Sequence, residues 1–264
     1  MKITVCELNT SGEALEQEWT NLMVHALSQA SDLVLLPEMP FSPWLAQATS
    51  FRGASWQAAI DAHNRWEARF PEFAFTRLAG TRPVDFGDSH NNAAFLWDAL
   101  HGLRTIHAKS HLENRHGSRK PVWYVSSPAE FTPVTIGGAV AAFLIGAELL
   151  ETAAIEEYSR DGVTLLLTPR STPASELQHW LDTAQIAARH GHVFSASSNR
   201  APAGGGWIID PDGAIIAFTD KSRPFVTVDV EFPGAPEIAR RRREQQPHPA
   251  HARVQIPGVN PANP

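Results

Sequence analysis

The stretch at 134–169 places the strongest constraint on how this chain can fold. It contains an apolar run at 136–145, a break at Gly146, a helical pattern at 147–160 and a second apolar run at 163–167. This order predicts a strand, a sharp turn, a helix and a second, buried strand, which is typical of α/β sheets. The turn residue of such a unit lies at the carboxyl edge of the sheet, where open α/β sheets carry their chemistry. A nucleophile would be expected there, and the residue is glycine.

The other predicted elements alternate between strand and helix in the first half and form hairpins in the second. Strands are predicted at 2–8, 33–36, 73–80, 91–97, 103–108, 193–198, 207–209, 214–218 and 225–230, and helices at 14–30, 55–69 and 175–190. This order indicates one α/β domain with two sheets flanked by helices. We assign that domain to 1–232, and we expect 233–264, which is basic and rich in proline, to be an exposed tail.

Composition and charge exclude several classes of protein. The 264 residues carry a net charge of −6, which argues against a general binder of nucleic acid or anionic membranes. No apolar stretch is long enough to span a membrane, and Met1-Lys2 leads directly into a strand, so we expect a cytoplasmic protein. With Cys6 as its only cysteine, the chain can form no intramolecular disulfide and no cysteine metal cluster. The histidines are scattered, and we expect no metal site.

The stretch at 134–169 resembles the nucleophile region of the nitrilase superfamily, the carbon–nitrogen hydrolases that include amidases and N-carbamoyl amino-acid hydrolases. Members carry a cysteine in a short motif at a strand end, followed by a helix and then a strand that ends in proline. Here the run reads Leu144-Ile145-Gly146-Ala147-Glu148-Leu149, so Gly146 stands where the family has its cysteine. The resemblance covers about 1–232 and implies a four-layer α-β-β-α sandwich of two mixed sheets flanked by helices.

Glu38 is the first candidate for a catalytic role. It follows the buried strand at 33–36 and lies between Pro37 and Pro40, which stiffen its backbone. From the residue pattern alone, a partly desolvated general base and a solvated loop glutamate are equal alternatives. Leu36-Pro37-Glu38 matches the family's base motif, so the resemblance implies that Glu38 is the base.

Lys109 is the second candidate. It follows the strand at 103–108 and precedes Ser110-His111-Leu112, a context similar to that of the family's lysine. A lone lysine is ordinarily a surface residue, but a fixed ammonium can stabilise a developing oxyanion. The resemblance implies that Lys109 and the backbone N–H of Ala147 hold the oxyanion.

The chain departs from the family pattern at a second carboxylate as well. Relatives usually carry another glutamate shortly before an aromatic pair; Trp123-Tyr124 could be this pair, but Lys120-Pro121 precede it. Glu113 could supply the carboxylate, although its spacing from Lys109 is short.

Substrate contacts are predicted from five residues. Trp44, Trp123 and Tyr124 could line the pocket as apolar walls or belong to the core, and Arg170 and Ser171 could reach its mouth or serve helix capping nearby.

The resemblance implies hydrolysis of a non-peptide C–N bond in a small amide, N-carbamoyl or nitrile compound, without metal or organic cofactor. The route would be covalent catalysis by a glutamate, a lysine and a cysteine. Glycine supplies no attacking atom. Cys6 does not obviously replace it, because its position within a strand indicates a small apolar core residue. We therefore expect a protein that is inactive as written or that traps its substrate. The alternative is a natural non-catalytic protein, or pseudoenzyme, that serves ligand binding or assembly. The resemblance also suggests a homodimer or a larger homo-oligomer.

Overall fold

The computed structural model describes residues 1–10, 12–45, 50–110, 132–202 and 204–234. Contacts group Met1–Phe232 into one compact unit. The predicted tail from 235 onward lies outside the described residues. Among the described residues, no helix combines the length and the apolar character needed to cross a membrane.

The strands of this unit form two groups joined at one place. The first group holds β1 (Lys2–Leu8), β2 (Leu33–Leu35), β3 (Arg77–Phe86), β4 (Ser89–Asp98), β5 (Gly102–Ala108) and β12 (Phe225–Asp229). The second holds β6 (Val134–Ile136), β7 (Ala139–Phe143), β8 (Leu165–Pro169), β9 (Phe194–Arg200), β10 (Trp207–Ile209) and β11 (Ile215–Phe218). A short parallel pairing of β1 with β9 connects them. Both groups contain parallel and antiparallel pairs, so each is a mixed sheet.

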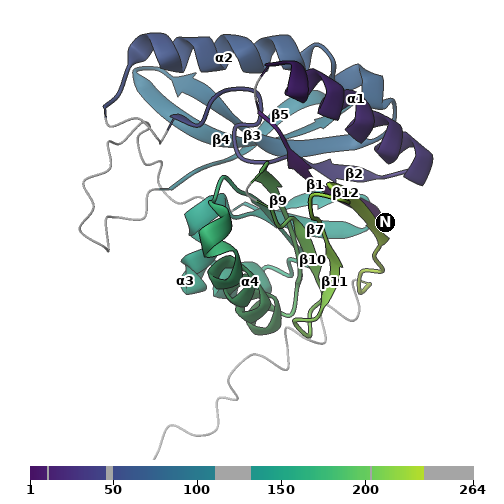
Figure 1. Cartoon of the computed structure of the whole chain (residues 1–264). Helices are drawn as coiled ribbons and strands as arrows, with labels where there is room; N and C mark the ends of the chain where they lie inside the picture. The colour runs from purple at the N-terminus through teal and green to yellow at the C-terminus, as the bar shows by residue number, and fades with distance from the viewer. Residues whose placement is uncertain (11, 46–49, 111–131, 203, 235–264) are drawn as a thin grey trace, which may run out of the picture. The chain divides into compact units, whose positions relative to one another are not determined.

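Helices cover the outer faces of both sheets (Figure 1). Helices α1 (Gly12–Gln29) and α2 (Gly53–Glu67) lie on the first sheet, and α3 (Thr152–Arg160) and α4 (Leu177–Gly191) lie on the second. A central apolar core packs β1, β2 and β3 against β7, β8 and β9. Two further cores lie between each sheet and its helices. The predicted four-layer sandwich is therefore confirmed.

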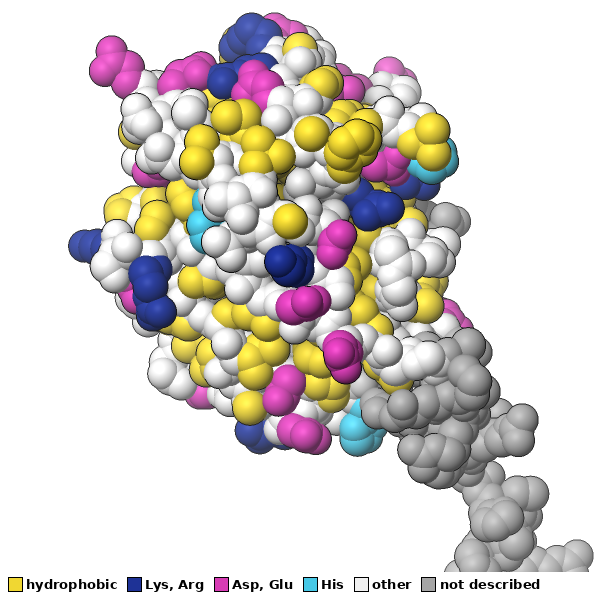
Figure 2. Space-filling view, turned by 90° about the vertical axis from the view of Figure 1, so that its right-hand side faces the viewer, with side chains coloured by type: hydrophobic (Ala, Val, Ile, Leu, Met, Phe, Trp, Pro, Cys, Tyr) yellow, Lys and Arg dark blue, Asp and Glu magenta, His cyan; other side chains and the backbone are white. Residues whose placement is uncertain are grey.

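Charges of both signs are interspersed on the molecular face drawn in Figure 2. Basic and acidic side chains are scattered over this face, and apolar side chains lie between them. Among the coloured residues of that face, no large cluster of one sign is present. This distribution agrees with the small negative net charge.

Several predicted element boundaries were wrong. The run at 136–145 begins at the last residue of β6 and turns at Gly137, with φ of +59°, so the strand within it, β7, covers only Ala139–Phe143 and pairs with β6. The helix predicted at 147–160 is divided into a 3₁₀ turn, η3 (Gly146–Leu150), and α3. The strand predicted at 73–80 begins later and extends to the β3–β4 turn, because it pairs with β4 along its whole length.

Strand direction brings three predicted sites to one edge. Strand β3 runs parallel to β2, and two successive antiparallel pairings give β5 the same direction as β3. Strand β7 reaches the same direction through β8, β9 and β1. The residues that follow β2, β5 and β7 therefore meet at the carboxyl ends of the strands. These residues include Glu38, Lys109 and Gly146.

Candidate active site

The backbone around Glu38 is held from both sides. Its N–H donates to the carbonyl of Arg170 at 3.1 Å, and the N–H of Met39 donates to Thr81 Oγ1 at 2.9 Å. Met39 has a φ of +45°, so the chain bends sharply directly after the glutamate. Glu38 is only 2% exposed, and the alternative of a solvated loop glutamate is therefore wrong.

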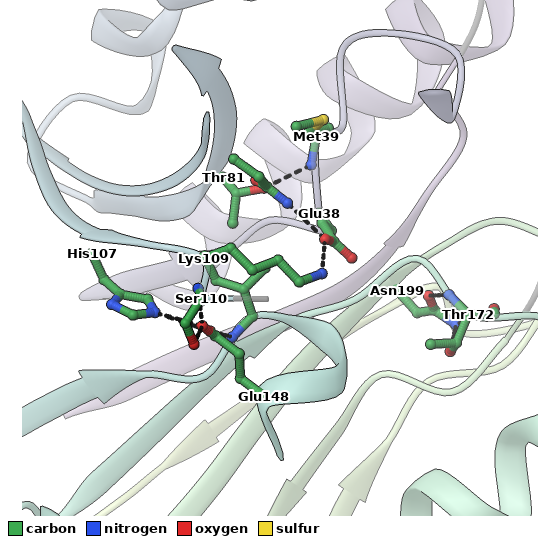
Figure 3. Close-up of polar contacts among 11 residues, drawn as sticks. Glu38, Met39, Thr81, His107, Lys109, Ser110, Glu148, Thr172 and Asn199 are labelled. Carbon is green, nitrogen blue, oxygen red and sulfur yellow. Dashed lines mark hydrogen bonds and ion pairs between the residues drawn. The ribbon is translucent and has the colours of Figure 1, made fainter. Parts of the chain in front are cut away.

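The carboxylate of Glu38 pairs with Lys109 (Figure 3). Lys109 Nζ lies 2.6 Å from Glu38 Oε1, and both side chains are largely buried. Asn92 Nδ2 donates to the same oxygen at 2.7 Å, and the carbonyl of Asn92 accepts from the N–H of Lys109 at 2.8 Å. Asn92 thus holds the glutamate and the lysine in one arrangement.

The sequence did not single out Asn92. It lies beside Asn91 in β4, and only one of two adjacent strand residues can face a given side of a sheet. The side chain of Asn91 bonds instead to the carbonyl of Ser89. A pair of asparagines in an otherwise apolar strand was the available signal, but it does not tell which of the two faces the site.

Gly146 faces this ion pair. It has a φ of +54°, a conformation that favours glycine, and it begins η3 directly after β7 and the two residues that follow it. A Cβ atom on residue 146 would lie 3.1 Å from Glu38 Oε2 and 3.2 Å from Lys109 Nζ. Any side chain at this position would therefore contact both charged groups. Ala147 follows within η3, and its role as an oxyanion donor stays a prediction.

The helical pattern at 147–160 predicts that its carboxylates, Glu148 among them, lie on the faces away from its apolar residues, but Glu148 is fully buried. Its carboxylate accepts from Ser110 N at 2.6 Å, Ser110 Oγ at 2.8 Å and Ile145 N at 2.7 Å. His107 Nε2 lies 2.9 Å from Oε2 and donates to it in the tautomer that protonates this nitrogen. The pattern was misleading because Ser110 and His107 belong to another part of the chain, while Ile145 is the N-cap residue of η3.

Arg170 turns its side chain into the protein interior. The guanidinium donates to Ser197 Oγ, Thr172 Oγ1 and the carbonyl of Gly205, and it lies 3.8 Å from the ring centroid of Trp207. Burial lowers the pKa of Arg170 to about 9, although the nearby carboxylates favour the charged form. Its carbonyl holds the N–H of Glu38. Arg170 therefore helps to hold the backbone of Glu38 in place. A direct contact between Arg170 and a ligand stays a prediction.

A second buried arginine, Arg200, was missed by the sequence analysis. Burial lowers its pKa to about 10, and Glu38 opposes this shift. Its guanidinium donates to Thr10 Oγ1 and the carbonyl of Ser42, and lies 5.7 Å from the ring of Trp44. Trp44 is half-buried beside it. The carboxylate of Glu38 thus lies in a positive environment.

Among the remaining candidates, Ser171 is half-buried after β8, and Glu113, Trp123 and Tyr124 lie outside the described residues. Cys6 is buried, and burial is the main reason why its pKa is raised to about 12. Its thiol is therefore not available as a thiolate near neutral pH. Within the described ranges, no group of three or more histidine, cysteine, aspartate or glutamate residues could hold a metal ion.

The strained position of residue 146 gives a stability prediction. Gly146→Ala is expected to lower the free energy of unfolding by about 2 kcal/mol. Alanine disfavours this φ, and its Cβ would lie closer to the Glu38–Lys109 ion pair than an ordinary van der Waals contact. Gly87→Ala is the matched control, since Gly87 has a φ of +59° and nothing within 4 Å of the added atom. The control should lose only about 1 kcal/mol in denaturant unfolding. If both variants lose the same free energy of unfolding, the close contact with the ion pair does not destabilise the Gly146→Ala protein.

Comparisons with known proteins show the family and the fold. The family model for carbon–nitrogen hydrolases matches residues 2–239. A search of curated proteins returns no match.

Solved structures share the fold. An amidase of the nitrilase superfamily from Nesterenkonia sp. AN1, solved as a cysteine-to-serine mutant, is 16% identical with a TM-score of 0.76, over 93% of this chain and 95% of that one. A double mutant of an amidase from the same source, in complex with acrylamide, is 18% identical with a TM-score of 0.72, over 92% and 95%. A CN-hydrolase superfamily protein from Xanthomonas campestris is 16% identical with a TM-score of 0.67, over 93% and 94%.

Proposed function

The chain belongs to the carbon–nitrogen hydrolase family, and on that premise we propose that Glu38, Lys109 and Gly146 form its ligand pocket, with Gly146 in the place of the family's cysteine. The pocket would take a small amide, N-carbamoyl or nitrile compound. Because glycine supplies no attacking atom, the protein would bind this compound without hydrolysing it.

One observation carries the proposal. The Cβ direction of residue 146 leads to within 3.2 Å of both the Glu38 carboxylate and the Lys109 ammonium. A thiol on that residue would have a base to take its proton and a cation to stabilise the oxyanion that its attack creates. A base and a cation are groups that covalent C–N hydrolysis needs, and residue 146 supplies no nucleophile to them.

The same groups are suited to hold an amide. Among the described residues, the hydrogen bonds to the Glu38 carboxylate converge on Oε1, and Oε2 is the oxygen nearest residue 146. Oε2 would accept an N–H of the ligand, and the Lys109 ammonium would donate to its carbonyl oxygen. The Nesterenkonia amidase that holds acrylamide carries alanine in place of a cysteine, which supports binding without a thiol.

Two origins are compatible with this function. A natural non-catalytic protein would keep the pocket for ligand sensing or for assembly, whereas a nucleophile mutant would trap the substrate of an active parent. Alanine or serine would be the more usual engineered substitution, and the chain departs from the family at a second carboxylate as well, so we favour the natural origin. The homo-oligomer and the cytoplasmic location both stay predictions.

Calorimetric titration with amides, N-carbamoyl compounds and nitriles tests the proposed binding. Lys109→Met should weaken the binding of the best ligand by tenfold or more, because a charge-assisted hydrogen bond to the carbonyl oxygen is lost. Lys221→Met removes an exposed lysine and is the matched control, with unchanged affinity. Equal affinity of the Lys109→Met protein, or no binding across the panel by the parent chain, would contradict the proposal.

A further inference from the structure

Glu148 joins the two chain segments that carry residue 146 and Lys109. One carboxylate oxygen accepts from the N–H of Ile145, directly before Gly146. The other accepts from the N–H of Ser110, directly after Lys109. One buried side chain thus ties together segments that are far apart in the sequence (Figure 3).

We propose that Glu148 is a positioning residue that fixes the distance between residue 146 and the Lys109 ammonium. The inference deepens the proposed function, because it assumes that Lys109 acts on a group bound at residue 146. It assigns to Glu148 no contact with the ligand.

The groups around Glu148 donate hydrogen bonds to its carboxylate, as a buried charged acceptor requires. The two oxygens receive two backbone N–H groups and one hydroxyl, and His107 lies within hydrogen-bond distance of both. A buried carboxylate is tolerated only where donors satisfy it, and a well-packed apolar residue would fill the same space without this requirement. We therefore attribute to the Glu148 carboxylate the role of fixing the two segments relative to each other, because an apolar residue could fill the same space.

Glu38 has contacts that do not involve Glu148. Its carboxylate bonds to Lys109 and Asn92, and its N–H bonds to the carbonyl of Arg170. The Glu38–Lys109 ion pair therefore keeps these contacts when Glu148 is replaced, and the turn that carries residue 146 is the segment that is freed. Loosening Glu148 should therefore displace Lys109 and residue 146 relative to each other while the Glu38 backbone stays in place.

This asymmetry can be measured on a thiol introduced by Gly146→Cys. The rate of alkylation by iodoacetamide follows the thiolate fraction, so its pH dependence reports the charges beside the sulfur. Lys109 favours the thiolate and Glu38 opposes it. If Glu148→Gln is added, the turn that carries residue 146 should move away from the Lys109 ammonium, which keeps its ion pair with Glu38. The midpoint of alkylation should then rise by about one pH unit, with a rate about tenfold lower below that midpoint. Loss of the Glu148 charge by itself would lower the midpoint, so a rise reports the displacement.

The parent chain serves as the blank, because its only cysteine, Cys6, is buried and its pKa is raised. Glu157→Gln in the Gly146→Cys background is the matched control, since Glu157 is exposed on α3, and it should leave the midpoint unchanged. Ser110→Ala removes only one hydroxyl donor and should raise the midpoint by a smaller amount. Glu148→Asp keeps the charge and should recover part of the shift.

A midpoint that stays the same in Glu148→Gln and in Ser110→Ala would overturn the proposal. Should Glu148→Gln fail to fold, Ser110→Ala decides the question by itself. The readout uses no amide ligand, so it stands even if the panel of amides and nitriles fails to bind. Failure of the proposed function is therefore distinguishable from failure of this inference.

Discussion

The Gly146→Cys protein is expected to release ammonia from at least one amide, N-carbamoyl compound or nitrile, at a rate at least about a thousandfold above that of the parent chain. The expectation follows from the size of the nucleophile's contribution, since removing the nucleophile of a hydrolase lowers kcat by about a millionfold in well-studied cases. The new Sγ would start from a Cβ that lies 3.1 Å from Glu38 Oε2 and 3.2 Å from Lys109 Nζ. The base and the cation are thus already beside the attacking atom.

Two further variants separate this route from other chemistry. Gly146→Ser adds a hydroxyl at the same place and should restore much less activity, because a hydroxyl is far harder to deprotonate than a thiol. Glu38→Gln in the Gly146→Cys background should abolish the gain. Turnover by the parent chain itself would contradict the mechanism. If both chains fold and neither releases ammonia, the departure from the family at the second carboxylate matters, and the non-catalytic alternative is favoured.

Arg170→Met is expected to destabilise the fold more than any surface substitution. The change leaves the buried carbonyl of Gly205 without its donor and removes a cation stacked on Trp207. It also removes the positive charge that acts on Glu7 and Glu38, two buried carboxylates. Removing one partner from a buried charge network costs about 3–5 kcal/mol. Thermal unfolding should therefore occur about 6–20 °C lower.

An exposed arginine gives the matched control for this loss. Arg223 has a side chain that is 69% exposed and pairs with Asp220 at 3.4 Å, so Arg223→Met should change stability by less than about 0.5 kcal/mol. Arg170→Lys should recover part of the loss, because an ammonium keeps the charge but cannot reach three acceptors in one plane. If the Arg170→Met protein unfolds at the same temperature as the parent, the buried guanidinium does not stabilise the fold, and the prediction is wrong.

The sequence singled out Glu38, Lys109 and Gly146 through the resemblance to a known family, and each follows a predicted strand. The residue pattern alone left a solvated glutamate and a surface lysine open. Strands of one direction end at one edge of a sheet, and the pairing in the tertiary structure gives the strands before these residues that common direction. The sequence could not indicate that the Glu38 carboxylate and the Lys109 ammonium form an ion pair, since their side chains come from strands separated by about seventy residues.

The buried polar residues were decided only by the tertiary structure. Helical periodicity assigns a carboxylate to the solvent because it counts neighbours within one element, whereas Glu148 is stabilised by Ser110 and by Ile145 before the turn. Asn92 was likewise indistinguishable from Asn91 until the pairing of β4 fixed which side chain faces Glu38. Local periodicity determines where strands begin and end because it depends on neighbours in the chain. The burial of a polar group depends on donors that other segments bring to it, and these meet only in the folded protein.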